Sequence, residues 1–136
     1  MQIGVDAARA VDNKRVLVVD GDDITATVLQ FMLQDENETH LFDSLAAAST
    51  VAAADLLLVG LDLLVAHGDP AALKTAFGGV RLLAVADRDA ATTADWTLKS
   101  GADGVVWKPL TVEAVRRAVD RQLGRRVELR VSVAVL

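Results

Sequence analysis

The sequence predicts an α/β fold, a doubly wound parallel sheet of five strands with helices on both of its faces. Two observations support this prediction. Short runs of apolar residues, typical of strands buried on both faces, alternate with helical segments five times along residues 14–124. This alternation implies parallel strands covered by helices on both sides. Because crossovers between parallel strands are right-handed, an open doubly wound sheet is the simplest arrangement of the five units.

The first unit is a valine-rich strand followed by an amphipathic helix. The strand covers residues 15–20 and leads into acidic residues, of which Asp22 or Asp23 can cap the helix expected at 24–33. The apolar face predicted for this helix consists of Ile24, Val28, Phe31 and Met32.

The second and third units are less regular. A weak strand at 39–43 precedes an alanine-rich stretch at 44–53, for which we expect a short helix. The next strand is DLLLVGLDLL, residues 55–64, which is almost entirely apolar and carries Gly60 where a side chain would be expected. The helix after it starts at or near Pro70, a residue that favours the first helical position.

The last two units follow the same order. A strand at 80–86 and a helix at 90–100 that Gly101 ends form the fourth unit. A short strand at 104–107 and a helix at 111–123 form the fifth. The final helix has the clearest amphipathic pattern in the chain, with an apolar side made of Val112, Val115, Val119 and Leu123.

The ends of the chain do not fit the repeating pattern. Residues 1–13 form an N-terminal extension of mixed composition, and residues 125–136 form a C-terminal extension. The stretch ELRVSVAVL alternates apolar and polar residues, which predicts a half-buried strand with no helix around it. This strand could pair with a sheet edge, pair with a second copy of the chain, or begin another domain. We favour pairing with an edge or a partner.

Composition limits the classes of function. The chain has 136 residues, 52% of them apolar, which is enough for one domain with a proper core. The net charge of -5 argues against a broad nucleic-acid surface, and the lack of cysteine excludes disulfides and thiolate metal sites. No apolar run reaches the roughly 18 residues of a membrane span. The N-terminus lacks a secretory signal, so we expect a cytoplasmic protein without a membrane partner.

The residues at the ends of the strands define the expected site, because function in such sheets lies at the carboxyl ends of the strands. The first strand ends at Asp20, Gly21, Asp22 and Asp23. The third ends at Gly60, Leu61 and Asp62. The fourth ends at Ala86 and Asp87, and the fifth at Trp107, Lys108 and Pro109.

Three of these stretches resemble the response-regulator receiver family over residues 14–123. They are VLVVDGDD before a helix, DLLLVGLD, and GADGVVWKPLTVEAV, which is the most specific. The resemblance implies the flavodoxin-like form of the doubly wound fold. Receivers transfer a phosphoryl group from a partner kinase to an aspartate. That chemistry needs a carboxylate nucleophile, Mg²⁺ held by acids, a cation for the phosphate and a hydroxyl that follows it.

Two positions of the family's phosphorylation pocket are retained. The resemblance places Asp20 at the first metal-binding acid and Lys108 at the cation that contacts the phosphate. It also implies a cis peptide between Lys108 and Pro109. If the carboxylate of the phosphoacceptor is missing, Lys108 is expected to pair with Asp20, which would otherwise hold an uncompensated, partly buried charge.

Four positions of that pocket are lost. The second acid is replaced by Gly21, and the phosphoacceptor position falls on Gly60. The switch hydroxyl falls on Ala86, and the aromatic that rotates in the fifth strand falls on Val105. Glycine cannot be a nucleophile, and alanine cannot hydrogen-bond a phosphate. These losses indicate a degenerate pseudo-receiver that works without phosphorylation, has no enzyme activity and needs no cofactor.

Two alternatives remain open. Asp62 could replace the lost acceptor together with Mg²⁺, although two residues along a strand would displace its carboxylate by about 6.6 Å. The small residues Gly21, Gly60 and Ala86 could instead leave a crevice for a metabolite or nucleotide. The weak metal candidates are Asp20, Asp22 and Asp23, and helix capping is the simpler role for the last two.

The favoured function is a protein–protein interaction or dimerisation module in bacterial signalling, bound to a protein partner or an output domain. Large aromatic residues are enriched where partners dock. In receivers the signalling face lies over the fourth helix, fifth strand and fifth helix. The interface candidates are Trp96, Trp107, Arg116, Val131 and Val133. Core packing is the alternative role for the two tryptophans.

Overall fold

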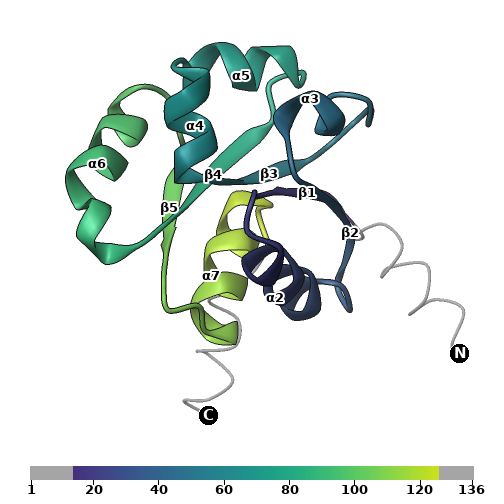
Figure 1. The fold of residues 1–136 in the computed structure, drawn as a ribbon. Helices are drawn as coiled ribbons and strands as arrows, with labels where there is room; N and C mark the ends of the chain where they lie inside the picture. Colours follow the sequence, from purple (N-terminus) through teal and green to yellow (C-terminus); the bar gives the residue numbers. More distant parts are fainter. Residues whose placement is uncertain (1–13, 126–136) are drawn as a thin grey trace, which may run out of the picture.

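The computed structural model describes residues 14–125 and confirms the predicted doubly wound sheet. All strand pairs are parallel, in the order β2-β1-β3-β4-β5 (Figure 1). The strands are β1 (Lys14–Val19), β2 (Asn37–Phe42), β3 (Leu56–Gly60), β4 (Arg81–Ala86) and β5 (Gly104–Trp107). The order turns back on itself between β1 and β3, which creates the topological switch point at which such folds bind ligands. The predicted C-terminal strand, with Val131 and Val133, and the N-terminal extension lie outside the described residues.

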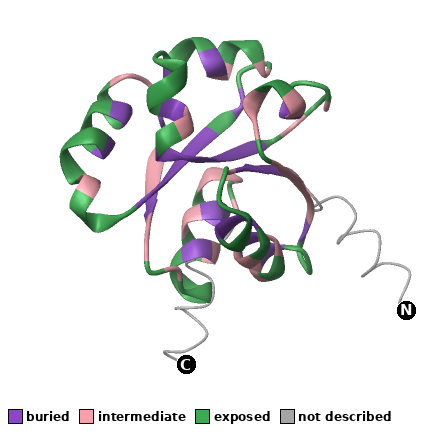
Figure 2. Cartoon of the chain, viewed as in Figure 1, coloured by how far each residue is buried: buried purple, intermediate pink, exposed green. Residues whose placement is uncertain are grey.

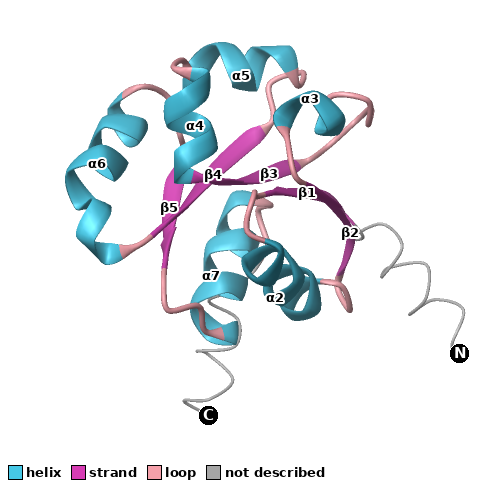
Figure 3. Cartoon of the chain, in the orientation of Figure 1, coloured by secondary structure: helices cyan, strands magenta, loops and turns pink. Residues whose placement is uncertain are grey.

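The helices form two layers, one on each face of the sheet (Figures 1 and 3). One layer consists of α2 (Asp23–Leu33) and α7 (Val112–Gln122). The other consists of α3 (Leu45–Ala48), α4 (Leu61–His67), α5 (Pro70–Ala76) and α6 (Ala91–Lys99), with a short 3₁₀ turn, η1 (Arg88–Ala90), before α6. None of the helices in residues 14–125 is long and apolar enough to cross a membrane.

The core is divided by the sheet into two apolar clusters (Figure 2). Alternate residues of one strand supply opposite clusters: Leu57 and Val59 face α3 to α6, whereas Leu56 and Leu58 face α2 and α7. All four side chains are fully buried. Because both faces of the sheet are buried, the sequences of the central strands are continuous apolar runs and do not alternate between apolar and polar residues.

The prediction for the face of α2 was wrong for Ile24 and Phe31, whereas Met32 packs against the core as predicted. Ile24 and Phe31 are 75% and 77% exposed, and the helix instead buries Ala26, Leu29 and Leu33. These three residues have the spacing of one helix face, and the small Ala26 lets the backbone approach the sheet closely. The bulkier side chains therefore face solvent because the opposite face fits the sheet better.

The prediction of a single strand over residues 55–64 was also wrong. β3 ends at Gly60, and α4 begins directly at Leu61. Leu61 and Leu64 are buried one helical turn apart, so the same apolar run serves both a strand and a helix. Periodicity cannot separate these alternatives in a short apolar run. Gly68 ends α4 in the left-handed conformation, with φ of 88°.

Two other helices differ from the expected pattern. The alanine-rich stretch forms only the four-residue helix α3, which Ser44 caps by accepting a hydrogen bond from the Ala47 amide. In α7 the apolar side is not fully buried, because Val112 is exposed in the first turn. Asp120 is buried and paired with Arg125 at 3.3 Å. That ion pair is what allows an acid to lie in the interior.

Candidate functional site

The fold brings the retained and the lost pocket positions to one edge of the sheet. Asp20 directly follows β1, Gly60 ends β3, Ala86 ends β4 and Lys108 follows β5. These four strands are neighbours in the parallel sheet, with Gly60 opposite Val85 across the β3–β4 pair. These residues therefore lie together at the carboxyl ends of neighbouring strands.

Asp20 and Gly60 lie against each other. A Cβ atom built on Gly60 would lie 2.9 Å from Oδ2 and 3.0 Å from Cγ of Asp20. The other carboxylate oxygen, Oδ1, accepts a hydrogen bond of 2.9 Å from the Asp22 amide, which fixes the side chain of Asp20 in this position. The carboxylate of Asp20 thus occupies the space that any side chain at position 60 would need.

The charge of Asp20 is poorly compensated. Desolvation by burial raises the pKa of Asp20 above its ordinary value, and the hydrogen bond from the Asp22 amide and the charge of Lys108 oppose that rise only in part. The neighbouring carboxylates of Asp22 and Asp62 raise the pKa of Asp20 further. The site therefore favours a bound proton or cation at this carboxylate.

Lys108 does not form the ion pair expected for it. Within residues 14–125, no salt bridge of 4.0 Å or less joins Lys108 to Asp20 or to another acid, and Lys108 acts on Asp20 only through its more distant charge. The backbone amide of Lys108 donates to the Ala86 carbonyl at 2.9 Å, which extends the β4–β5 pairing. The Lys108–Pro109 peptide is cis, as the resemblance implied.

Asp22 caps α2, in agreement with the prediction. Its Oδ1 accepts from the Ile24 amide at 3.1 Å, and its Oδ2 accepts from the Thr25 hydroxyl at 2.8 Å. The hydrogen bond from Thr25, followed by that from Ile24, lowers the pKa of Asp22. Asp23 is exposed in the first helical turn. In the described part of the chain, no group of three or more acids and histidines is arranged to hold a metal ion.

The remaining predicted positions, Gly21, Ala86 and Val105, differ in the space around them and in their burial. A Cβ atom on Gly21 would meet nothing within 4 Å, so an acid would fit there without rearrangement. Ala86 is buried, and Val105 is half-buried against the cluster under α3 to α6. Neither residue offers a polar group to the strand-end site.

Asp62 lies on a helix rather than on the expected strand. It is exposed in the first turn of α4, two residues after Gly60. The displacement along a strand that we expected for its carboxylate does not apply, because the chain turns at Gly60. Its charge still raises the pKa of Asp20, so the two carboxylates share one electrostatic environment.

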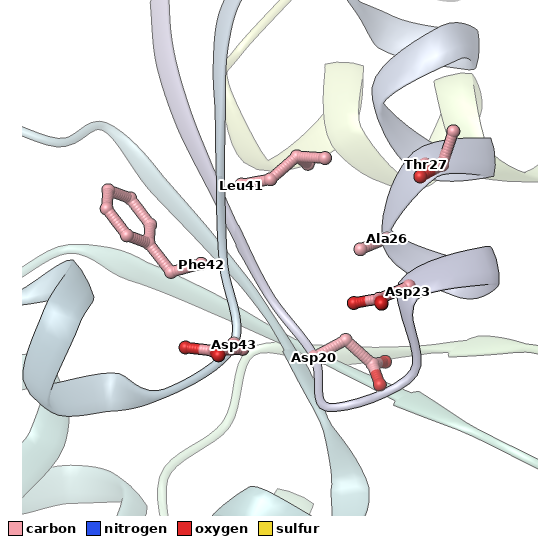
Figure 4. Close-up of a pocket in the computed structure, with 7 residues that line it drawn as sticks. All are labelled: Asp20, Asp23, Ala26, Thr27, Leu41, Phe42 and Asp43. Carbon is pink, nitrogen blue, oxygen red and sulfur yellow. The ribbon is translucent and has the colours of Figure 1, made fainter.

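A pocket of about 380 Å³ lies on the other side of Asp20, between β2 and α2 (Figure 4). Three carboxylates and four further residues line it: Asp20, Asp23, Asp43, Ala26, Thr27, Leu41 and Phe42. None of the three small residues predicted to form a ligand crevice lines this pocket. Sequence reasoning missed it, although Asp43 directly follows β2 and so marks a further acidic strand end.

The predicted interface residues lie in three environments. Trp96 is 37% exposed on α6, and Leu98 beside it in sequence is exposed as well. Trp107 is half-buried against the core, with the guanidinium of Arg88 5.9 Å from its ring centre. Arg116 is half-buried and is tied to the C-terminal end of α2, because it donates to the Met32 carbonyl at 3.1 Å and to both carboxylate oxygens of Asp35.

Similar solved structures are response regulators and their receiver domains. NtrX from Brucella abortus, solved in complex with ADP, matches with a TM-score of 0.73 at 19% identity over 90% of this chain. A response regulator receiver domain from Clostridium thermocellum matches with a TM-score of 0.67 at 16% identity, over 82% of this chain and 94% of its own. CheY4 of Vibrio cholerae matches with a TM-score of 0.69 at 18% identity, over 81% of this chain and 98% of its own.

These likenesses establish the flavodoxin-like receiver fold. The chain spans only 29% of the NtrX chain, whereas it covers nearly the full length of the two single-domain structures. No family model matches the sequence, and a search of curated proteins found no match.

Proposed function

We propose that this chain is a pseudo-receiver, a receiver-fold domain of two-component signalling that acts as a protein–protein interaction or dimerisation module without being phosphorylated. The observation that carries the proposal is the contact between Asp20 and Gly60. Position 60 has no nucleophile, and the carboxylate of Asp20 fills the space in which a side chain would lie. Phosphoryl transfer to this position has no acceptor, and any side chain placed there would have to displace the Asp20 carboxylate.

The remaining parts of a phosphorylation switch are also missing. Ala86 has no hydroxyl to follow a phosphate, and Val105 has no aromatic ring to rotate. Lys108 keeps a cation at the site, but no acid in the described part of the chain lies within ion-pair distance of it. A signal passed through this domain would therefore be a change of partner rather than a covalent change at β3.

The surface of α6 and β5 is the docking face that we propose for the partner. Trp96 and Leu98 expose apolar area on α6, and exposed aromatic residues are frequent anchors in interfaces. Trp107 adds a half-buried ring with Arg88 over it. Both residue types are enriched at interface hot spots.

The test is treatment with acetyl phosphate, or with beryllofluoride and Mg²⁺, followed by intact-mass measurement and NMR. We expect no added phosphate and no chemical-shift changes centred on Asp20, Gly60 and Lys108. A stoichiometric, acid-labile phosphate would overturn the proposal. Replacement of Trp96 by Ala tests the docking face separately, because it should weaken partner binding without altering the phosphorylation result.

A second candidate is an active receiver that uses Asp62. The observation that favours it is that the charge of Asp62 acts on Asp20, so that both carboxylates are close to the same site. If Asp62 accepts the phosphoryl group, Asp62→Asn abolishes labelling and Asp69→Asn, a matched change at an exposed helix cap, does not. The absence of labelling in the unaltered protein excludes this candidate.

A further inference from the structure

The solvent-facing side of α2 is apolar. It consists of Ile24, Val28 and Phe31, which the helical repeat places in one stripe. Ile24 and Phe31 are the two most exposed large apolar residues in the described part of the chain, and Val28 between them is half-buried. A helix that covers a sheet normally presents polar residues on that side. An exposed apolar patch in this position is typical of an interaction surface.

The neighbouring helix α7 extends this apolar surface. α2 and α7 lie side by side, and Arg116 of α7 donates to the Met32 carbonyl (Figure 1). Arg125, which follows α7, donates to the Glu36 carbonyl, so the two helices run in the same direction. Val112 lies one helical turn before Arg116 and therefore on the side of α7 that faces α2, and it is exposed. The apolar surface thus spans both helices of this layer.

The two ends of this surface carry opposite charge. At the amino ends of α2 and α7, the first turns contain acids and no cation. The exposed acids here are Asp23, Glu113 and Asp22, which caps α2. At the carboxyl ends, besides the ion pair of Asp120 with Arg125, three cations outnumber two acids: Arg116, Arg117, Arg121, Asp35 and Glu36. The surface is therefore negative at one end and positive at the other.

Such a surface is complementary to a second copy of itself in the antiparallel orientation. When α2 packs against α2 of another copy about a two-fold axis at Val28, Ile24 of each copy lies opposite Phe31 of the other, because these residues lie four positions before and three positions after Val28. The negative end of each copy then meets the positive end of the other, and the symmetry makes every contact occur twice. Parallel packing would instead bring the acids of the two copies together.

The size of the surface sets the strength of the dimer. Each helix has 11 residues, which gives a length of about 16 Å, and packed helices lie about 8–10 Å apart. A face of these dimensions buries less than the roughly 800 Å² that each partner contributes to a standard stable interface. We therefore expect a weak dimer that forms as the protein concentration rises.

We propose that α2 and α7 form a homodimer surface, in which Ile24, Val28 and Phe31 of two copies pack antiparallel about a two-fold axis. The inference gives the dimerisation part of the proposed function a surface, and it rests on that function only in taking the domain as an interaction module. The surface is separate from the docking face on α6 and β5, because α6 covers the opposite face of the sheet. The dimer therefore leaves α6 free for another partner.

Sedimentation equilibrium of the full chain over a range of protein concentrations tests the surface. Phe31→Asp places a charge in the apolar stripe of both copies, and we expect it to raise the dissociation constant of the dimer at least about tenfold. Val65→Asp is the matched control, because it changes an exposed valine on α4, in the other helical layer, and should leave association unchanged. Thermal unfolding checks that both variants fold. A chain that stays monomeric throughout, or equal effects of the two variants, would overturn the proposal.

Disulfide trapping tests the orientation, because the chain has no cysteine of its own. Chains with Ile24→Cys and chains with Phe31→Cys are oxidised separately and as a mixture. Antiparallel packing brings position 24 of one copy to position 31 of the other, so we expect the mixed dimer to form several-fold faster than either dimer of like chains. Chains with Val65→Cys measure the rate of random collision. Faster linkage between two Ile24→Cys chains, or equal rates for all pairings, would contradict the antiparallel dimer.

The two proposals fail in different ways. A chain that is labelled by acetyl phosphate but still forms the mixed dimer would contradict the proposed function alone. A chain that stays unlabelled and forms no mixed dimer would contradict this surface alone.

Discussion

The acids at the two ends of the sheet differ in how well their charge is compensated. At the amino ends of β4 and β5, Asp103 is mostly buried and accepts hydrogen bonds from Lys74 at 3.0 Å and from the Leu82 amide at 2.8 Å. At the carboxyl ends, the charges of Asp22 and Asp62 raise the pKa of Asp20, and no salt bridge within residues 14–125 compensates it. Both acids lie beside the same sheet, so the difference lies in their partners.

The contrast indicates which end is built for stability. A buried acid with cationic and amide partners fixes the packing of α5 against β4 and β5. An acid left with like-charged neighbours costs stability, and such sites are retained mainly where a protein binds something. Of the two acids, Asp20 at the carboxyl ends of the strands is therefore the one whose charge is less well compensated.

The largest effect is expected at the amino end. Asp103→Ala leaves Lys74 and the Leu82 amide without their acceptor, and we expect a loss of about 2–4 kcal/mol in the free energy of unfolding. Urea denaturation measures it. Asp95→Ala is the matched control, since it removes an exposed ion pair with Lys99 on α6 and should cost at most about 0.5 kcal/mol. Equal losses of stability in the two variants would mean that the partners of Asp103 contribute no more than an exposed ion pair, which would contradict the contrast between the two ends of the sheet.

A smaller effect is expected when an acid is returned to β3. Gly60→Asp forces the Asp20 carboxylate aside and places two like charges together, for a loss of about 1–2 kcal/mol. Gly60→Ala adds the same Cβ atom, which also displaces the Asp20 carboxylate, but it adds no charge and φ of -56° suits any residue, so it should cost less than the aspartate variant. Thermal unfolding of both variants, with and without Mg²⁺, separates the effect of the added Cβ atom from the effect of the added charge. Stabilisation by Mg²⁺ is expected only for the aspartate variant.

Removal of the charge at Asp20 should increase stability. The pKa of Asp20 is higher in the folded than in the unfolded state, so the folded state binds the proton more tightly. The stability that this contributes is complete below the ordinary pKa and is lost as the pH rises through the folded value. Asp20→Asn should therefore stabilise the protein at pH 7, by less than about 1 kcal/mol because the group is partly solvated.

The pH dependence tests that explanation. The advantage of Asp20→Asn should shrink as the pH falls towards 3.8, the ordinary pKa of an aspartate, where Asp20 itself becomes protonated. Asp22→Asn should show the opposite sign, since its pKa is lowered in the folded state by the hydrogen bonds of the helix cap. Parallel pH profiles for the two variants would contradict the opposite directions of the pKa shifts of Asp20 and Asp22.

The sequence predicted the two helical layers and the residues at the strand ends. It did not predict which side chains of a helix would be buried and which would be exposed. The succession of strands and helices and the position of Lys108 followed from apolar runs and a motif, because both are set locally along the chain. The end of β3 at Gly60 and the identity of the buried face of α2 did not follow from the sequence, since each depends on which side of a helix fits the sheet. The pocket beside Asp43 depends on the approach of β2 to α2, two elements that no motif connects.

The smallest effect is expected on the proposed docking face. Arg88 is exposed and lies 5.9 Å from the ring centre of Trp107, so Arg88→Ala should cost only about 0.5 kcal/mol. The fluorescence of Trp107, measured in a Trp96→Phe background, should nevertheless change, because the cation leaves the ring. Arg117→Ala, an exposed change on α7, should alter neither quantity. An unchanged spectrum would mean that Arg88 does not lie over the ring in solution, and Trp107 would then be free to contact a partner directly.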